Sequence, residues 1–374
     1  MFSKKGLIII FFCLEIAYAA TFAGNGPNGT HYIVIPDIPG YYTLKCDFHT
    51  HTIFSDGLVW PTIRVDEALK CGLDAIAITD HIEHQPYIQD VNPGHNRSNE
   101  IASAYAENKG LVVIPGAEIT REMPPGHFNA IFIKDADKLA LNDVMDVFRE
   151  AKAQGAFVFW NHPAWQPQCQ NGIAQLSDMH KDLIKKGYIQ GIEIVNGVTD
   201  NYSDESFHFA LKYNLAPMCN SDIHGLGEWE WNQSGHRPVT LVFAKEKTAE
   251  SIREALIAGR TTAYYENYII GKAEFLNALF LSSLNINAYY PIDQAIATIR
   301  IKNNSDVDYL CENKSKYTFQ SDPYFFIIPA QSTRTILVKT GDRLQSFNVE
   351  LLVHNLVSSP GKGTEVNLHV QLPG

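Results

Sequence analysis

The sequence is poor in cysteine, has no internal repeat and contains no apolar run long enough to span a membrane. Its six cysteines show no paired spacing, and Cys13 falls in a leader-like N-terminal segment, so an odd number is left. That pattern does not describe a disulfide framework. Cys46, Cys71 and Cys219 stand in apolar contexts and are predicted to be core thiols. The absence of repeats and low-complexity tracts excludes solenoid and fibrous architectures.

The chain is also short of positive charge. It has 30 lysines and arginines against 41 aspartates and glutamates, a formal net charge of −11. A chain of this sign is not expected to bind nucleic acid specifically. An acidic protein that handles phosphates needs metal ions or a local basic patch to offset its own field. The length of 374 residues allows a large core and two domains.

The N-terminus has the pattern of a secretory signal peptide. Lys4 and Lys5 precede an apolar run at 7–12, and Ala17 and Ala19 form a small-residue cleavage site. The alternative, a membrane anchor, needs a longer apolar run than this one. We therefore expect removal of residues 1–19, a secreted or periplasmic protein, and no transmembrane anchor in the mature chain.

Between residues 41 and 265, short apolar strands alternate with helical stretches. Strands are predicted at 43–48, 75–79, 111–114, 130–133, 156–160, 191–195, 216–220 and 239–243, and helices at 61–71, 96–108, 142–154, 203–213 and 248–258. Strands and helices at this spacing predict a parallel sheet, and their number favours a barrel.

The pattern changes after about residue 285, where short strands are separated by turns. Strands are predicted there at 296–301, 324–328, 335–338, 347–353 and 365–370. They indicate a small antiparallel β-sandwich of Ig-like type. We expect a barrel over 24–270, a connecting helix or covering segment over 271–284, and the sandwich over 285–374.

Metal-competent side chains follow successive strands of the predicted barrel. Asp47, His49 and His51 alternate along one strand and so share a face. In such barrels functional groups lie at the C-terminal ends of the strands. The full set of candidate ligands is His49, His51, Asp56, His81, Glu118, His127, His162, Asp222 and His224. Taken alone, Asp56 is explained as a turn residue and Asp80 as a helix cap, but the joint placement favours a metal site.

Nine nitrogen and oxygen donors exceed what one ion needs and suit two or three divalent ions. No cysteine is among them, so the donors suit zinc, manganese or iron(II). Divalent ions lower the pKa of a bound water, and two neighbouring ions can hold that nucleophile and the oxygens of a phosphoryl group. The pattern therefore predicts a hydrolase that uses a metal-activated water.

The motifs resemble those of the PHP (polymerase and histidinol phosphatase) family of metal-dependent phosphoesterases, in its secreted, phosphodiesterase-like branch. The matching stretches, in order, are Asp-Phe-His-Thr-His-Thr at 47–52, Ser-Asp-Gly at 55–57, Thr-Asp-His at 79–81, Gly-Ala-Glu-Ile at 116–119, Asn-His-Pro at 161–163, Ser-Asp-Ile-His at 221–224 and Ala-Gly-Arg-Thr at 258–261. The resemblance covers residues 41 to about 265.

This resemblance implies a distorted (β/α)7 barrel with up to three metal ions. By motif position, it implies three ligand groups: His49, His51, Glu118 and Asp222 for one ion; Glu118, His127 and His162 for a second; and Asp56, His81 and His224 for a third. It implies hydrolysis of a small phosphorylated substrate, as a phosphodiesterase or phosphomonoesterase, with Asp222 or His224 as candidates for moving protons.

Other roles rest on position alone. Arg121 and Arg237 lie in predicted loops near the site and are expected to contact phosphate, the alternative being solvated arginines. Glu193 and Asn196 are expected to orient the ligands. Trp165, Trp229 and Trp231 either stack on substrate or pack the loops. Two other functions fit the same residues: hydrolysis of amides or carboxylic esters at the same centre, and a non-catalytic binding module.

Overall fold

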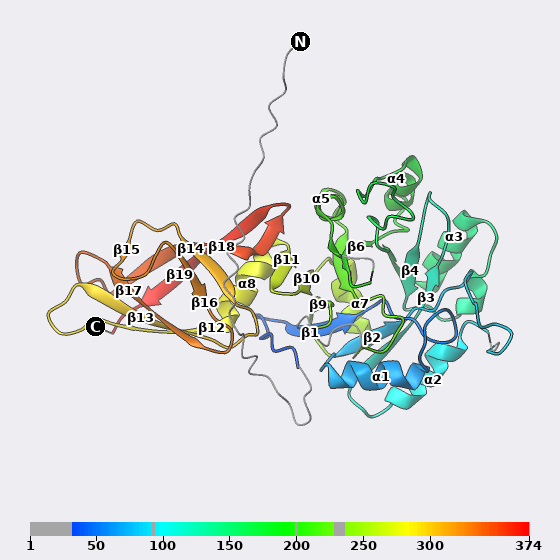
Figure 1. Cartoon of the computed structure of the whole chain (residues 1–374), viewed down its shortest axis with the longest axis horizontal. Helices are drawn as coiled ribbons and strands as arrows, with labels where there is room; N and C mark the ends of the chain where they lie inside the picture. The colour runs from blue at the N-terminus through cyan, green and yellow to red at the C-terminus, as the bar shows by residue number, and fades with distance from the viewer. Residues whose placement is uncertain (1–31, 92–93, 199–200, 228–235, 374) are drawn as a thin grey trace, which may run out of the picture.

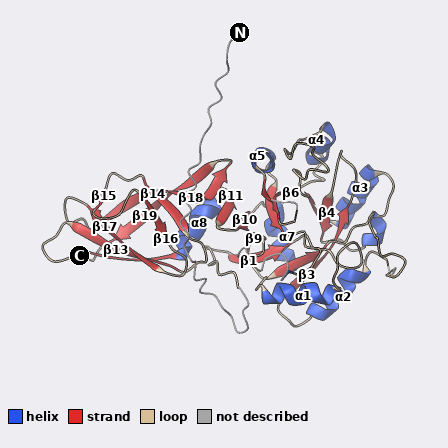
Figure 2. Ribbon diagram, in the orientation of Figure 1, coloured by secondary structure: helices blue, strands red, loops and turns tan. Residues whose placement is uncertain are grey.

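The computed structural model describes residues 32–91, 94–198, 201–227 and 236–373. It has a barrel-like α/β part and a β-rich C-terminal part, which lie side by side in Figure 1. Figure 2 shows that most helices surround the first part, whereas the second is almost entirely strand. Residues 1–19, predicted to be a signal peptide, lie outside the described residues. Among the helices described, none has the length and apolar character needed to cross a lipid bilayer.

Seven strands form the wall around which the first part is built. They are β1 (Tyr42–Asp47), β2 (Ala75–Ile78), β3 (Val112–Ile119), β4 (Phe128–Ile131), β5 (Phe157–Trp160), β6 (Gly191–Asn196) and β8 (Ala216–Asn220). They are hydrogen-bonded in that order, and all neighbours are parallel except where β4 runs in the opposite direction. Just beyond β1 and β8, a bridge between Thr50 and Ile223 joins the two ends of the row. The expected distorted (β/α)7 barrel is thus confirmed, with one reversed strand.

Helices cover the outside of this wall, as period-3.6 patterning predicts. They are α1 (Pro61–Lys70), α2 (Arg97–Ala106), α3 (Val144–Gln154), α4 (Asp178–Lys185), α5 (Asp204–Tyr213) and α7 (Ala249–Ile257), with a 3₁₀ turn η1 (Ala136–Leu139) and a two-residue strand β7 (Asn201–Tyr202) between them. Local chemistry sets their ends. The Asp143 carboxylate accepts hydrogen bonds from two backbone N–H groups at the start of α3, and Gly155, with φ of 80°, ends it.

Three further strands extend the sheet beyond β1. They are β9 (Val239–Ala244), β10 (Thr261–Tyr265) and β11 (Tyr268–Gly271). Each pairs antiparallel with the strand before it in the sheet: β9 with β1, β10 with β9 and β11 with β10. The helix α8 (Ala273–Ser283) follows, in the stretch where the sequence predicted a helix or covering segment.

The C-terminal part is a two-layered β-sandwich, as expected. Its strands are β12 (Leu284–Tyr289), β13 (Ile296–Asn303), β14 (Tyr309–Asn313), β15 (Thr318–Phe319), β16 (Phe325–Ile328), β17 (Thr333–Lys339), β18 (Ser346–Ser359) and β19 (Lys362–Gln371). One sheet has the order β12-β13-β17-β15, and the other contains β16, β14, β18 and β19. Alternate residues of β19 are buried, as a strand with one solvated face requires.

The two parts share one sheet and one core. In the register of β11 and β18, which pair in parallel, Ile269 lies opposite Leu356 and Ile270 opposite Val357. The sheet therefore continues from the barrel strands into the sandwich. Tyr264 of β10 and Val353 of β18 also belong to the same cluster of buried apolar side chains.

Candidate metal centre

The structure brings all nine candidate ligands to one rim of the barrel. His49 and His51 follow β1, Asp56 lies in the loop between β1 and α1, His81 follows β2, Glu118 is the last residue but one of β3, His162 follows β5, and Asp222 and His224 follow β8. His127 precedes its strand instead of following it. It still reaches the rim, because the reversed strand β4 begins at the end where its parallel neighbours finish.

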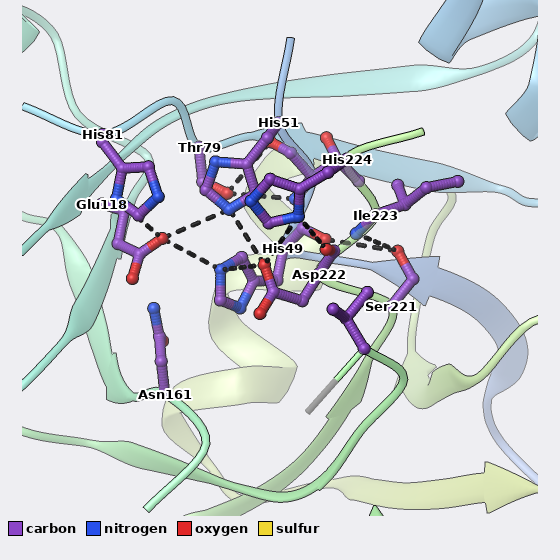
Figure 3. A network of polar contacts seen from close by, with 12 residues as sticks. His49, His51, Thr79, His81, Glu118, Asn161, Ser221, Asp222, Ile223 and His224 are labelled. Atoms are coloured by element: carbon purple, nitrogen blue, oxygen red, sulfur yellow. Dashed lines mark hydrogen bonds and ion pairs between the residues drawn. The ribbon is translucent and has the colours of Figure 1, made fainter. Parts of the chain in front are cut away.

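The centre of the cluster consists of two imidazoles facing two carboxylates (Figure 3). Nε2 of His49 lies 3.1 Å from an oxygen of Glu118 and 3.1 Å from Oδ1 of Asp222. Nε2 of His51 lies 3.2 Å and 3.0 Å from the same two oxygens. All four side chains are almost completely buried.

Glu118 faces different imidazoles with its two oxygens. Oε2 is near His49 and His51, and it also lies 3.3 Å from Nδ1 of His81. Oε1 lies 2.9 Å from Nδ1 of His127 and 3.9 Å from Nε2 of His162. A single buried carboxylate thus lies between two groups of nitrogen donors.

A third group lies on the other side of His51. Oδ1 of Asp56 is 3.3 Å from Nε2 of His224 and 3.5 Å from Nε2 of His81. The ring of His51 stacks against both of these imidazoles, with centroid distances of 4.3 Å to His224 and 4.5 Å to His81.

Among the residues that the structure describes, three groupings bring ligand atoms within 4.8 Å of one another: His51, Asp56, His81 and His224; His49, His51 and Asp222; and His49, Glu118 and His162. The first contains the whole third set implied by the family resemblance, with His51 added. The second lies within the implied first set. The third combines His49 with two members of the implied second set, and His127 joins it through Glu118.

A further shell of polar groups fixes these ligands. Glu193 on β6 lies 2.9 Å from Nδ1 of His49 and accepts a hydrogen bond from the backbone N–H of His162 at 2.8 Å. The Asn196 amide donates to Glu193 at 2.9 Å and to Asp222 at 3.2 Å. The expectation that Glu193 and Asn196 orient ligands therefore agrees with the contacts. Such partners set the tautomer and direction of a ligand ring.

The backbone is also unusual at two ligands. His162 has φ of 30° and Asp222 has φ of 57°, in the left-handed region that non-glycine residues rarely occupy. Such conformations persist where the surroundings hold them, often at functional sites. Here the N–H of His162 is bound to Glu193, and the N–H of Asp222 to the carbonyl of His49 at 2.9 Å.

The electrostatics of the cluster favour positive charge. Burial opposes protonation of His49, but the carboxylates of Asp222, Glu193 and Glu118 hold its pKa well above the usual value. Burial likewise opposes ionisation of Glu118, yet the imidazoles of His81 and His49 hold its pKa well below the usual range. Burial lowers the pKa of His162 to about 4, which leaves its ring neutral and available as a ligand near neutral pH.

The residues fit a group of divalent cations. In the described part of the chain, Nε2 of His51, Oε1 of Glu118 and Nδ1 of His127 are buried and make no hydrogen bond of good geometry, although each lies close to other donor atoms of the cluster. Buried polar atoms normally have partners. Imidazole and carboxylate donors without thiolate are the set that zinc, manganese and iron(II) accept.

The two arginines predicted to contact substrate both have partners within the protein. Arg237 is buried, and its Nε and Nη2 each lie 2.6 Å from Oδ2 of Asp47, so this placement contradicts the predicted substrate contact. The physical reason is that β9 runs antiparallel to β1 and brings Arg237 beneath the site, against a buried carboxylate. Arg121 is partly exposed, and its Nη2 lies 2.9 Å from Glu83 and donates to the carbonyl of Leu141. Its contact with substrate stays a prediction.

Aromatic and histidine side chains line the rim. The Trp165 ring lies 5.0 Å from that of His162 and 5.5 Å from that of His127, measured between centroids. Trp229 and Trp231, also predicted near the site, lie outside the described residues. His84, which the sequence reading did not single out, is more than half exposed, and its Nε2 is 3.8 Å from Oδ2 of Asp56. Its position three residues after His81 was the sequence feature that could have predicted its place near the site.

Comparison with known proteins adds to this geometry. An Ig-like domain family, DUF5001, matches residues 284–369. An uncharacterized protein, MJ1295, of Methanocaldococcus jannaschii is 35% identical over 82 residues, which are 22% of this chain and only 36% of that protein. A candidate metal-dependent phosphoesterase from Bifidobacterium adolescentis is 17% identical, with a TM-score of 0.41 over 59% of this chain and 98% of that one, too distant to bear on function.

One solved structure matches the whole arrangement. It is a two-domain protein from Bacteroides vulgatus containing a predicted PHP-like metal-dependent phosphoesterase. It is 38% identical to this chain, with a TM-score of 0.85, and the match covers 92% of this chain and all of that one. Together with the ligand cluster and the Ig-like module, this similarity shows that the chain belongs to the PHP-like metal-dependent phosphoesterases.

Proposed function

We propose that this protein hydrolyses phosphate esters of small molecules, as a phosphodiesterase or a phosphomonoesterase, at a centre of two or three divalent metal ions. The observation that carries the proposal is the position of Glu118. Its two oxygens face separate groups of imidazoles, which is how one carboxylate holds two neighbouring cations. Bound divalent ions would supply Lewis acidity for the phosphoryl oxygens and activate a water.

The side chains of this protein have distinct roles in the proposed reaction. His49, His51 and Asp222 would hold one ion with Glu118, and Glu193 keeps His49 in the orientation needed. His224 is the most exposed of the nine ligands, with 29% of its side chain accessible, and Nδ1 lies 2.7 Å from the carbonyl of Asp222. Asp222 and His224 remain the proposed groups for moving protons at the rim.

The proposal is tested with purified protein and a panel of chromogenic substrates. We expect at least two equivalents of zinc, manganese or iron per chain, and hydrolysis of phosphodiesters or phosphomonoesters that chelation abolishes. Glu118→Gln keeps the side-chain shape but removes the charge, and it is expected to lose both metal and activity. Glu100→Gln, an exposed carboxylate on α2, is the matched control and is expected to behave as the wild type.

Other outcomes would contradict the proposal. Hydrolysis of acyl or amide substrates with no phosphoesterase activity would support the alternative of an amidohydrolase or carboxylic-ester hydrolase. Fewer than two equivalents of metal together with no hydrolysis of any substrate would support a binding module. We also propose export of the protein, on the N-terminal pattern of residues 1–19. Cell fractionation is expected to find the protein outside the cytoplasm with an N-terminus near residue 20, and protein that stays in the cytoplasm with Met1 intact would contradict export.

A further inference from the structure

Arg64 is a fully buried arginine that stands apart from the proposed ligands. It lies on α1, on the same helical face as the buried residues Pro61, Val65 and Ala68. Its side chain is completely inaccessible to solvent. Arginine is almost never fully buried unless it is paired, so the contacts of this guanidinium need an explanation.

The guanidinium uses all five of its N–H donors. Nε donates to the carbonyl of His51 at 2.8 Å. Nη2 donates to the carbonyls of Ile223 at 3.1 Å and His224 at 2.8 Å, and Nη1 donates to the carbonyl of Gly225 at 2.7 Å. The fifth bond, at 2.7 Å, goes from Nη1 to Glu67, one helical turn away.

These four carbonyls belong to two chain segments that carry ligands. One segment follows β1 and contains His51, and the other follows β8 and contains Asp222 and His224. The segments are also bonded directly, through the N–H of His51 and the carbonyl of Ile223 at 3.1 Å. Glu67 completes the arrangement, because its other oxygen accepts from the N–H of Gly227.

We infer that Arg64 is a positioning residue that locks the His51 segment against the segment carrying His224, and so sets the affinity for an ion at His51, Asp56, His81 and His224. This inference rests on the proposed function, since it assumes that the cluster holds metal. No hydrogen bond in the described contacts links Arg64 to Glu118, His127 or His162. His51 and Asp222 also belong to the ligand group of a neighbouring ion, so the effect is expected at the sites that contain these two residues and least at Glu118, His127 and His162.

The substitution Arg64→Lys tests the charge of the side chain separately from its hydrogen-bonding geometry. It keeps a positive charge beside Glu67, so the buried carboxylate is still compensated. It lacks the planar fork, and one ammonium with three donors cannot reach carbonyls on both segments in the same way. A role limited to charge compensation is therefore met by Arg64→Lys, whereas a positioning role is not.

The test is a titration of metal-free protein with Co²⁺ alone, followed by the visible absorption of the bound ion. Arg64→Lys is expected to weaken one class of site by about 10- to 100-fold, as loss of a supporting contact does in metal sites. A Co²⁺ ion held by Glu118, His127 and His162, which lie outside the two segments, is expected to keep wild-type affinity. Asp56→Asn, which removes a ligand of the same cluster, provides the reference titration that Arg64→Lys is expected to resemble.

The matched control is Arg253→Lys. Arg253 on α7 also donates through Nε and Nη2 to a backbone carbonyl, that of Gly155, in the short turn after α3. It is expected to bind Co²⁺ as the wild type does. Thermal unfolding of both variants shows whether any loss of metal follows from a general loss of stability.

Each outcome decides the inference. An Arg64→Lys titration identical to the wild type overturns it, and so does an equal weakening of every site. If Arg64→Lys does not fold, Glu67→Gln decides: it removes the carboxylate that anchors Nη1, and an unchanged titration overturns the inference. Wild-type protein that binds no Co²⁺ contradicts the proposed function instead, so the two failures are distinguishable.

Discussion

Substitution of Glu193 by glutamine is expected to disable the centre although Glu193 is not a proposed ligand. The carboxylate is buried and contacts four donor groups. Oε1 lies 2.9 Å from Nδ1 of His49 and accepts from the Asn220 amide at 2.9 Å. Oε2 accepts from the backbone N–H of His162 at 2.8 Å and from the Asn196 amide at 2.9 Å.

The size of the effect follows from this geometry. Glutamine has one carbonyl oxygen and one NH₂ group, so in either orientation the NH₂ group faces two donors. Two hydrogen bonds to a charged acceptor are lost, each contributing about 1.5–3 kcal/mol, so the free energy of unfolding is expected to fall by about 3–6 kcal/mol. Misorientation of His49 and His162 is expected to lower metal affinity by about 10- to 100-fold, or about 1.4–2.7 kcal/mol.

Glu193→Gln is assayed by urea unfolding and by Co²⁺ titration of the metal-free protein. Asp74→Asn is the matched control, because Asp74 also accepts from a backbone N–H, that of Lys45 at 2.9 Å, but at the opposite end of β2. It is expected to change stability without changing metal affinity. Wild-type metal affinity in a folded Glu193→Gln protein would refute the reasoning.

Three other perturbations test separate parts of the structure. Burial lowers the pKa of His180 to about 4, below the unfolded value of about 6.5, so its contribution to stability is complete above the unfolded pKa and is lost as the pH falls towards 4. Urea unfolding is therefore expected to show a loss of about 2 kcal/mol between pH 7 and pH 5 that is absent in His180→Gln, and equal losses in both proteins would contradict this. Gly57→Ala places a Cβ 2.7 Å from the backbone carbonyl carbon of His51, so the loop must shift and Co²⁺ affinity is expected to fall; an unchanged titration would show that the loop adapts. Deletion of residues 284–374 exposes the shared core and is expected to give insoluble or loosely packed protein by near-UV circular dichroism, and a soluble fragment with wild-type stability would refute that expectation.

The ligand cluster could be predicted because the ligands follow successive strands in the sequence, and parallel strands of a barrel all end at the same rim. In a parallel barrel every strand delivers its following residue to the same rim, so Glu118 and His162 meet although 44 positions separate them. His127 was harder to place, because it precedes its strand. Only the reversal of β4, which depends on pairing with β3 and β5, brings it to the rim.

The burial of two arginines, Arg237 and Arg64, was not predicted from the sequence. Arg237 was expected to contact phosphate and Arg64 was not singled out, yet both side chains are buried and bind groups distant in sequence. Burial of a charged side chain depends on tertiary partners, here Asp47 for one and the carbonyls beyond β1 and β8 for the other. The helical spacing of Arg64 with Val65 and Ala68 was a signal of its burial. Asp80, for which a helix cap was only the alternative explanation, does not cap a helix: its carboxylate accepts from Thr52 and Ser55 in the site loop.

The parallel pairing of β11 with β18 has a consequence for how the molecule would act if its C-terminal module were tethered to a surface. A flexible linker would let the rim that carries the candidate ligands point in many directions. Here the backbone hydrogen bonds and the shared apolar core hold the rim in one orientation relative to the C-terminal module. The side from which a substrate could reach the rim would then be fixed relative to the surface. A different domain in place of this module would also need an edge strand able to pair with β11 at Ile269 and Ile270.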